Sequence, residues 1–116
     1  MPSDPAEAPL RDILHHIELA EGFLVGFEYA TFQADIRTVY AVTRCLEIIS
    51  EASRRLPDTL KARHSLIAWK QMAAAGNIYR HEYEDVAAHF VWDTVQRDLK
   101  SPRVAVLEEL SRLERS

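Results

Sequence analysis

The sequence predicts a single all-α domain over residues 1–116, folded as an antiparallel bundle of four to five helices. A chain of 116 residues is long enough for one hydrophobic core and too short for two. Hydrophobic residues make up 47% of the chain and recur mostly at steps of three and four, as on the buried faces of helices. Only three glycines are present, so the turn residues that an all-β domain requires are missing.

The first two helices are expected to be long and to pair antiparallel. Apolar residues at steps of three and four between Leu10 and Phe27 mark a helix with one buried face. A second helix is expected to start near Thr31, whose side chain can cap its first turn, and to end before Pro57, which cannot continue a helix. Residues 1–8 are expected to be flexible.

The third helix is expected to run from about Ser65 through Tyr83, after a short polar segment that reaches His64. Gly76 interrupts this helix. A glycine in a helix interior costs about 1 kcal/mol relative to alanine. We therefore expect a structural reason for this glycine.

Two further helices complete the expected bundle. Asp85 can cap the fourth, and Ser101 followed by Pro102 can cap and open the fifth. No internal repeat, low-complexity tract or long linker divides the chain.

The charge balance and the single cysteine exclude several classes of protein. Fourteen basic and 18 acidic residues give a formal net charge of −4, so any RNA site must be local rather than a broadly basic surface. Cys45 is the only cysteine, which excludes a disulfide framework and a multi-cysteine metal site and fits a reducing cytoplasm. No apolar run approaches the length of about 18 residues that a membrane span needs, and the first residues include acids where a signal peptide would be basic. A cytoplasmic protein is expected.

Four of the five histidines are expected to be ordinary surface or partly buried side chains. They are His15, His16, His64 and His89. No two histidines lie in the His-Glu-x-x-His arrangement of a zinc site. We therefore expect neither a metal nor a cofactor.

The fifth histidine differs because of its neighbours near the end of the third helix. Four polar side chains share one helix face here, because their positions differ by three, four and seven residues. They are Asn77, Arg80, His81 and Glu84. One interpretation is a solvated face in which Arg80 and Glu84 form a pair worth about 0.2–0.5 kcal/mol. The other is a catalytic or binding site.

The segment from Trp69 to Tyr83 resembles the HepT-like branch of the HEPN superfamily, and the resemblance covers nearly the whole chain. Its most specific part is the pattern Asn-x-x-x-His-x-Tyr, which Asn77, His81 and Tyr83 match. The resemblance implies a homodimeric helical bundle that acts on RNA as a metal-independent endoribonuclease, the toxin of a toxin–antitoxin pair. It also implies a minimal nucleotidyltransferase antitoxin as partner, which can transfer AMP to Tyr83.

The residue types fit RNA cleavage without a metal. The imidazole of His81 can take a proton from the ribose 2′-hydroxyl or give one to the leaving oxygen, and the guanidinium of Arg80 can stabilise charge on the phosphorus. Asn77 completes the predicted catalytic set, with Glu84 and Gly76 as supporting residues. Because one chain carries one such histidine, a two-fold dimer would place two in a shared cleft and supply both an acid and a base.

The sequence departs from the family pattern at the arginine that usually precedes the histidine with four to six residues between them. Those positions hold Gly76, Ala75 and Ala74. Arg80 directly precedes His81, about 100° around the helix, and so cannot occupy the same point in space. A catalytically degenerate module that binds a nucleotide or a partner therefore stays open as the alternative function.

Three aromatic residues each have two interpretations. Tyr83 lies about 200° from His81 on an ideal helix, so it either faces a partner or packs beside Tyr79 one turn earlier. Trp69 and Trp92 are expected to anchor the core or a dimer interface rather than to stack on bases.

Overall fold

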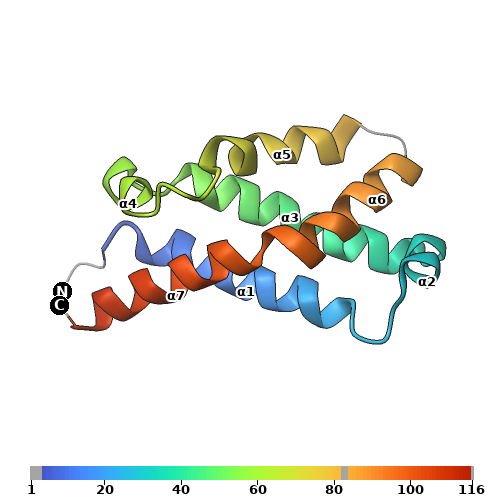
Figure 1. The fold of residues 1–116 in the computed structure, drawn as a ribbon, viewed down its shortest axis with the longest axis horizontal. Helices are drawn as coiled ribbons and strands as arrows, with labels where there is room; N and C mark the ends of the chain where they lie inside the picture. The colour runs from blue at the N-terminus through green and yellow to red at the C-terminus, as the bar shows by residue number, and fades with distance from the viewer. Residues whose placement is uncertain (1–3, 82–83, 116) are drawn as a thin grey trace.

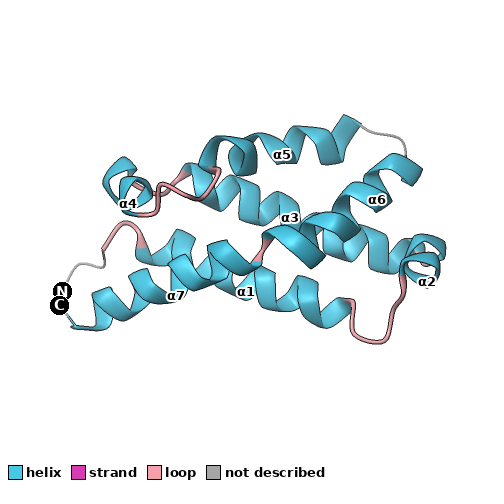
Figure 2. Cartoon of the chain, viewed as in Figure 1, coloured by secondary structure: helices cyan, strands magenta, loops and turns pink. Residues whose placement is uncertain are grey.

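The computed structural model describes residues 4–81 and 84–115, and for residues 77–81 and 84–87 it describes the backbone alone. Every regular element in this part of the chain is helical, which confirms the predicted all-α class (Figure 2). In chain order the elements are α1 (Glu7–Phe23), α2 (Tyr29–Ala34), α3 (Ile36–Arg54), α4 (Asp58–Arg63), α5 (Trp69–His81), α6 (Glu84–Asp93), the π-helix η1 (Thr94–Asp98) and α7 (Lys100–Arg115) (Figure 1). None of the helices within these ranges is long and apolar enough to cross a membrane.

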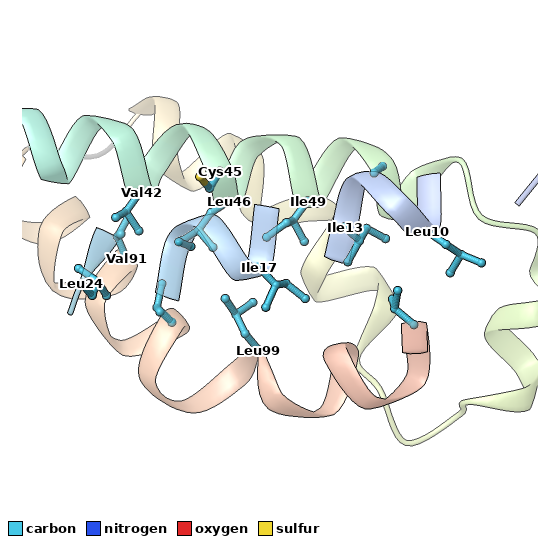
Figure 3. Close-up of a cluster of buried hydrophobic side chains, with 14 of the residues drawn as sticks. Leu10, Ile13, Ile17, Leu24, Val42, Cys45, Leu46, Ile49, Val91 and Leu99 are labelled. Carbon is cyan, nitrogen blue, oxygen red and sulfur yellow. The ribbon is translucent and has the colours of Figure 1, made fainter. Parts of the chain in front are cut away.

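The core lies between α1, α3 and α7. α1 and α3 run antiparallel and pack along most of their length, and α7 lies along α1 (Figure 1). Ile13 and Ile17 of α1 are fully buried against the apolar face of α3, which presents Leu46 and Ile49 (Figure 3). Each such side chain stabilises the fold by about 1.5–3 kcal/mol when it leaves water. The predicted antiparallel pairing of the first two long helices is confirmed.

The prediction of one continuous helix from Thr31 to Leu56 is wrong, because the chain breaks at Asp35. The backbone of Asp35 is extended, with φ −103° and ψ 93°, and its carboxylate accepts a hydrogen bond from the Thr38 amide at 3.3 Å. Asp35 thus caps a new helix, which separates α2 from α3. Thr31 does not cap α2 either: it lies inside the helix, and its hydroxyl accepts from the Glu28 amide at 3.0 Å in a capping box.

The segment after Pro57, expected to be a polar connection, contains the short helix α4. Its end is fixed to α7 by a group of three side chains, Arg63, His64 and Glu109, which we call the Glu109 cluster. Arg63 donates two hydrogen bonds to the Glu109 carboxylate, at 2.7 and 3.2 Å, and His64 Nε2 lies 2.7 Å from the same carboxylate. These partners are 45 and 46 residues apart in the chain, so no local spacing could indicate them.

The third predicted helix starts later than expected, at Trp69 rather than Ser65. The indole N–H of Trp69 donates to the backbone carbonyls of Lys61 and His64, each at 3.1 Å. These bonds tie the start of α5 to the end of α4. The chain between the two helices is therefore a turn, and α5 starts four residues later than predicted.

The last third of the chain is one bent helical path, in which η1 joins α6 to α7 (Figure 1). α6 starts at Glu84, so Asp85 lies inside the helix rather than capping it. α7 starts at Lys100, one residue before the predicted cap Ser101. A π-helical turn is rare and is often found near functional sites. Here it bends the path so that α6 packs on α2 and α3 while α7 returns along α1.

Candidate functional site

The predicted site residues lie at the end of α5 and the beginning of α6. α5 packs along the C-terminal half of α3, and the chain changes direction between α5 and α6 (Figure 1). Asn77, Arg80 and His81 all belong to α5, and His81 is its last residue. Glu84 is the first residue of α6, so the spacing argument that put it on the same helix face does not apply to it. Tyr83 lies outside the described residues.

A close contact between α3 and α5 explains the glycine inside the helix. Gly76 is buried, and its amide N–H donates to the hydroxyl of Ser50 at 3.3 Å. The same hydroxyl donates to the carbonyl of Ala73 at 2.9 Å. A Cβ at position 76 would lie 3.2 Å from Ser50 Oγ and 3.5 Å from Nη2 of Arg54. Glycine therefore allows α5 to approach α3 closely, and we call this contact the Ser50–Gly76 seam.

The sequence analysis did not identify Ser50 or Arg54, although one signal pointed to the first. Ser50 follows Leu46 by four residues and Ile49 by one, so it lies on the apolar face of α3, where it is only 1% exposed. A small hydroxyl residue at a core position of one helix, together with a glycine inside another, is compatible with a close helix–helix contact but does not show that the two meet. Arg54, one turn further on, is exposed and gave no such signal.

The charges on α5 are all positive. Residues 69–81 include Lys70 and Arg80 and no aspartate or glutamate. Arg54 adds a third cation where α3 meets α5. Lys70, Arg54 and Arg80 are therefore cations on or beside α5, whereas the acids Glu82, Glu84 and Asp85 follow His81 directly in the sequence.

A cleft of about 540 Å³ lies between α3, α5, η1 and α7, on the side of the Ser50–Gly76 seam that faces the start of α5. Its wall includes Ser50, Met72, Ala75, Arg97 and Asp98. Among the described residues, those of α5 that line it lie between Gln71 and Ala75. The cleft shares α3 and α5 with the seam but lies closer to the start of α5 than His81 does.

The residues expected to have no chemical role have ordinary local partners. His16 Nδ1 lies 2.7 Å from the carbonyl of Asp12, and His89 Nε2 lies 3.3 Å from the carboxylate of Asp93. Cys45 is buried in the core, and this burial raises the pKa of its thiol, so the thiolate is disfavoured. Among the described side chains, no group of three or more His, Cys, Asp or Glu is placed to hold a metal ion.

Both tryptophans are structural anchors. Trp92 packs against Phe32 and Tyr29, with ring centroids 5.3 and 5.9 Å apart. Trp69 packs on the core and holds α4 through its two hydrogen bonds. The prediction that they anchor the fold is confirmed for the core.

Comparison with known proteins gives one family. Residues 13–112 match the family model described as "Ribonuclease HepT-like". A protein of Thermococcus cleftensis named "Probable ribonuclease HepT" is 39% identical over 92 residues, which are 79% of this chain and 84% of that protein. "Putative RNase MJ1216" of Methanocaldococcus jannaschii is 31% identical over 85% of this chain and 82% of its own length. "Putative RNase TTE0752" of Caldanaerobacter subterraneus is 31% identical over 88% of this chain and 95% of its own length. No solved structure matches.

Proposed function

Because this chain belongs to the HepT-like ribonuclease family, we propose that it is a metal-independent endoribonuclease and the toxin of a toxin–antitoxin pair. The observation that carries the proposal is the family match over residues 13–112, which includes the whole of α5 with Asn77 and His81. RNA as the substrate is further supported by the absence of acids from α5 and by the cation Arg54 beside it, because cations can bind phosphates even on an acidic protein.

The proposed reaction is attack of a ribose 2′-oxygen on the adjacent phosphorus. The 2′-hydroxyl loses its proton to a base as the bond to phosphorus forms, and the 5′-oxygen of the next nucleotide leaves with a proton from an acid. His81 takes one of these roles, since an imidazole can act as acid or base near neutral pH. Arg80 stabilises the charge that develops on the phosphate, and Asn77 orients the reacting groups by hydrogen bonding.

A homodimer would supply the second histidine. With one His81 in each chain, a two-fold axis near the end of α5 brings an acid and a base to one shared cleft. A chain that stays monomeric at micromolar concentration in light scattering would contradict the shared cleft.

The test of the nuclease is RNA cleavage in the presence of EDTA. His81→Ala is expected to lose the factor of about 10²–10⁴ that a general acid or base contributes, and Arg80→Ala is expected to be impaired as well. His89→Ala is the matched control, because this histidine is 65% exposed on α6 and its partners are Asp93 on the same helix and the ring of Tyr29 on α2. Equal cleavage by the wild type and all three variants would indicate a contaminant.

The alternative is a catalytically degenerate module that binds a nucleotide or a partner. The specific observation in its favour is Gly76, which stands where the family pattern has an arginine and which is buried against Ser50. In that case the protein would lack cleavage activity while still binding its antitoxin.

We further propose that a minimal nucleotidyltransferase is the antitoxin and that Tyr83 accepts AMP from it. An AMP group at this place adds bulk and negative charge beside Arg80 and His81, and so repels an RNA phosphate. Co-expression with the cognate transferase is expected to add the mass of one or a few AMP groups, lost in Tyr83→Phe and kept in the control Tyr40→Phe. Modification that persists in Tyr83→Phe would move the acceptor elsewhere, with Tyr79 the next candidate.

A further inference from the structure

We propose that Arg54 of α3 binds an RNA phosphate beside His81 and supplies the guanidinium that α5 lacks at Gly76. This inference rests on the proposed ribonuclease function and adds a residue to its site. It starts from the Ser50–Gly76 seam, where a residue without a side chain meets an arginine from the neighbouring helix.

The geometry places the Arg54 guanidinium directly over α5. Its Nη2 atom lies 3.5 Å from the position that a Cβ of residue 76 would occupy. Ser50, one turn earlier on α3, is bonded to Gly76 and Ala73 and so holds the two helices together at this level. Because position 76 has no side chain, the guanidinium of Arg54 lies directly beside the backbone of α5.

The charge of Arg54 is available, in contrast to that of its neighbour. Arg55 lies 3.1 Å from the carboxylate of Asp12 and 4.0 Å from that of Glu51. Arg54 has no carboxylate within salt-bridge distance among the described side chains, and it is exposed to solvent. An exposed arginine without a carboxylate partner among the described side chains is suited to bind a phosphate.

The position along α5 fits a shared substrate. Gly76 and His81 are five positions apart, which corresponds to a rise of about 7.5 Å along a helix. Five positions also rotate the helix face by about 140°, so the inference requires an RNA backbone that crosses α5 to reach both Arg54 and residue 81. Arg54 would act as a phosphate ligand, while proton transfer stays with His81.

The salt dependence of RNA binding distinguishes a phosphate ligand from a structural residue. The probe is a fluorescent oligouridine with 2′-O-methyl groups, which cannot be cleaved through its 2′-oxygen. Each phosphate contact to a single strand adds about 0.7 to the slope of log Kd against log salt concentration. Arg54→Gln is expected to lower this slope by about 0.7 and to weaken binding about tenfold at low salt.

The matched control is Arg37→Gln, which removes the same charge from an exposed position in the first turn of α3, at the other end of the helix. Equal slopes for Arg54→Gln and Arg37→Gln would overturn the inference and leave the nuclease proposal standing. A wild type that binds no RNA would overturn both.

A relocation variant tests whether a guanidinium at this place is what matters. In the Arg54→Gln background, Gly76→Arg restores the cation from α5, and Ser50→Gly removes the Oγ and Cβ atoms that would otherwise lie 3.2 and 3.6 Å from the new Cβ. The triple variant is expected to regain the lost salt slope. If it keeps its cooperative thermal unfolding but does not regain the slope, phosphate binding at this place is contradicted.

Discussion

Two contacts fix α5 to the rest of the bundle, and they are built from opposite kinds of side chain. At the start of α5, Trp69 is bonded to the backbone at the end of α4, which the Glu109 cluster joins to α7. In the middle of α5, the Ser50–Gly76 seam uses a hydroxyl and a glycine and no charge. The first contact links α5 through an indole to a cluster of paired charges, and the second brings the backbones of α3 and α5 together.

The difference shows which charged side chains are paired within the fold and which are open to solvent. In the Glu109 cluster the carboxylate is only 5% exposed, accepts hydrogen bonds from Arg63 and lies beside His64. Its charge is therefore already paired within the folded protein. At the seam the neighbouring cation, Arg54, is left open to solvent. A paired buried charge serves structure, whereas an open charge held by uncharged packing is free to bind a ligand. Breaking each contact separately tests this contrast.

The largest effect on stability is expected from Glu109→Ala. The substitution removes three close contacts and leaves Arg63 and His64 without their acceptor, at a cost of about 1–3 kcal/mol in the free energy of unfolding. The cost stays at this moderate level because the Arg63 side chain is 40% exposed and water can solvate it. Urea unfolding measures the loss. Glu108→Ala, the exposed neighbour on α7, is the control and is expected to change stability by less than about 0.5 kcal/mol.

The same cluster predicts how stability depends on pH. The hydrogen bond from Arg63, aided by His64, lowers the pKa of Glu109 below its ordinary value of 4.5. A carboxyl with a depressed pKa in the folded state stabilises the protein above its unfolded pKa, and this stabilisation is lost as the pH falls through the folded pKa. The difference in unfolding free energy between the wild type and Glu109→Gln should therefore be constant near neutral pH and shrink below about pH 4.5. A difference that does not change down to acid unfolding would show that Glu109 contributes by packing alone.

The contrast between the two contacts also marks how far the sequence could predict the fold. Local periodicity was sufficient for the long helices, because Ile13, Ile17, Leu46 and Ile49 show their buried faces through spacing alone. It did not predict the break at Asp35, because the apolar pattern continues through the break and a single capping carboxylate decides it. It also did not predict α4, whose six residues are held by a partner far away in the chain.

For the candidate site, the sequence predicted a segment but could not predict what surrounds it. The motif residues Asn77 and His81 are recognisable by type and spacing, and α5 carries both. Arg54 belongs to another helix, and its proximity to Gly76 depends on the close packing of α3 on α5. Side chains that meet only through tertiary packing leave no periodic signal, so the seam became visible only in the folded chain.

The seam itself predicts a smaller and conditional effect. Gly76→Ala should gain about 1 kcal/mol from helix propensity, but its Cβ would lie 3.2 Å from Ser50 Oγ, an atom held in place by the carbonyl of Ala73. We expect the variant to be neutral or destabilised in the wild-type background and to be stabilising by about 0.5–1 kcal/mol in the Ser50→Ala background. Urea unfolding of the four proteins gives a coupling of about 1 kcal/mol between the two positions.

Gly22→Ala is the matched control for this cycle, because a Cβ at that position of α1 would meet no heavy atom within 4 Å. It is expected to stabilise the protein by about 0.5–1 kcal/mol whether residue 50 is serine or alanine. If Gly76→Ala were as stabilising as Gly22→Ala in the wild-type background, α5 would not be pressed against Ser50. Glycine at position 76 would then need another explanation, such as access of an RNA phosphate to the backbone between Arg54 and His81.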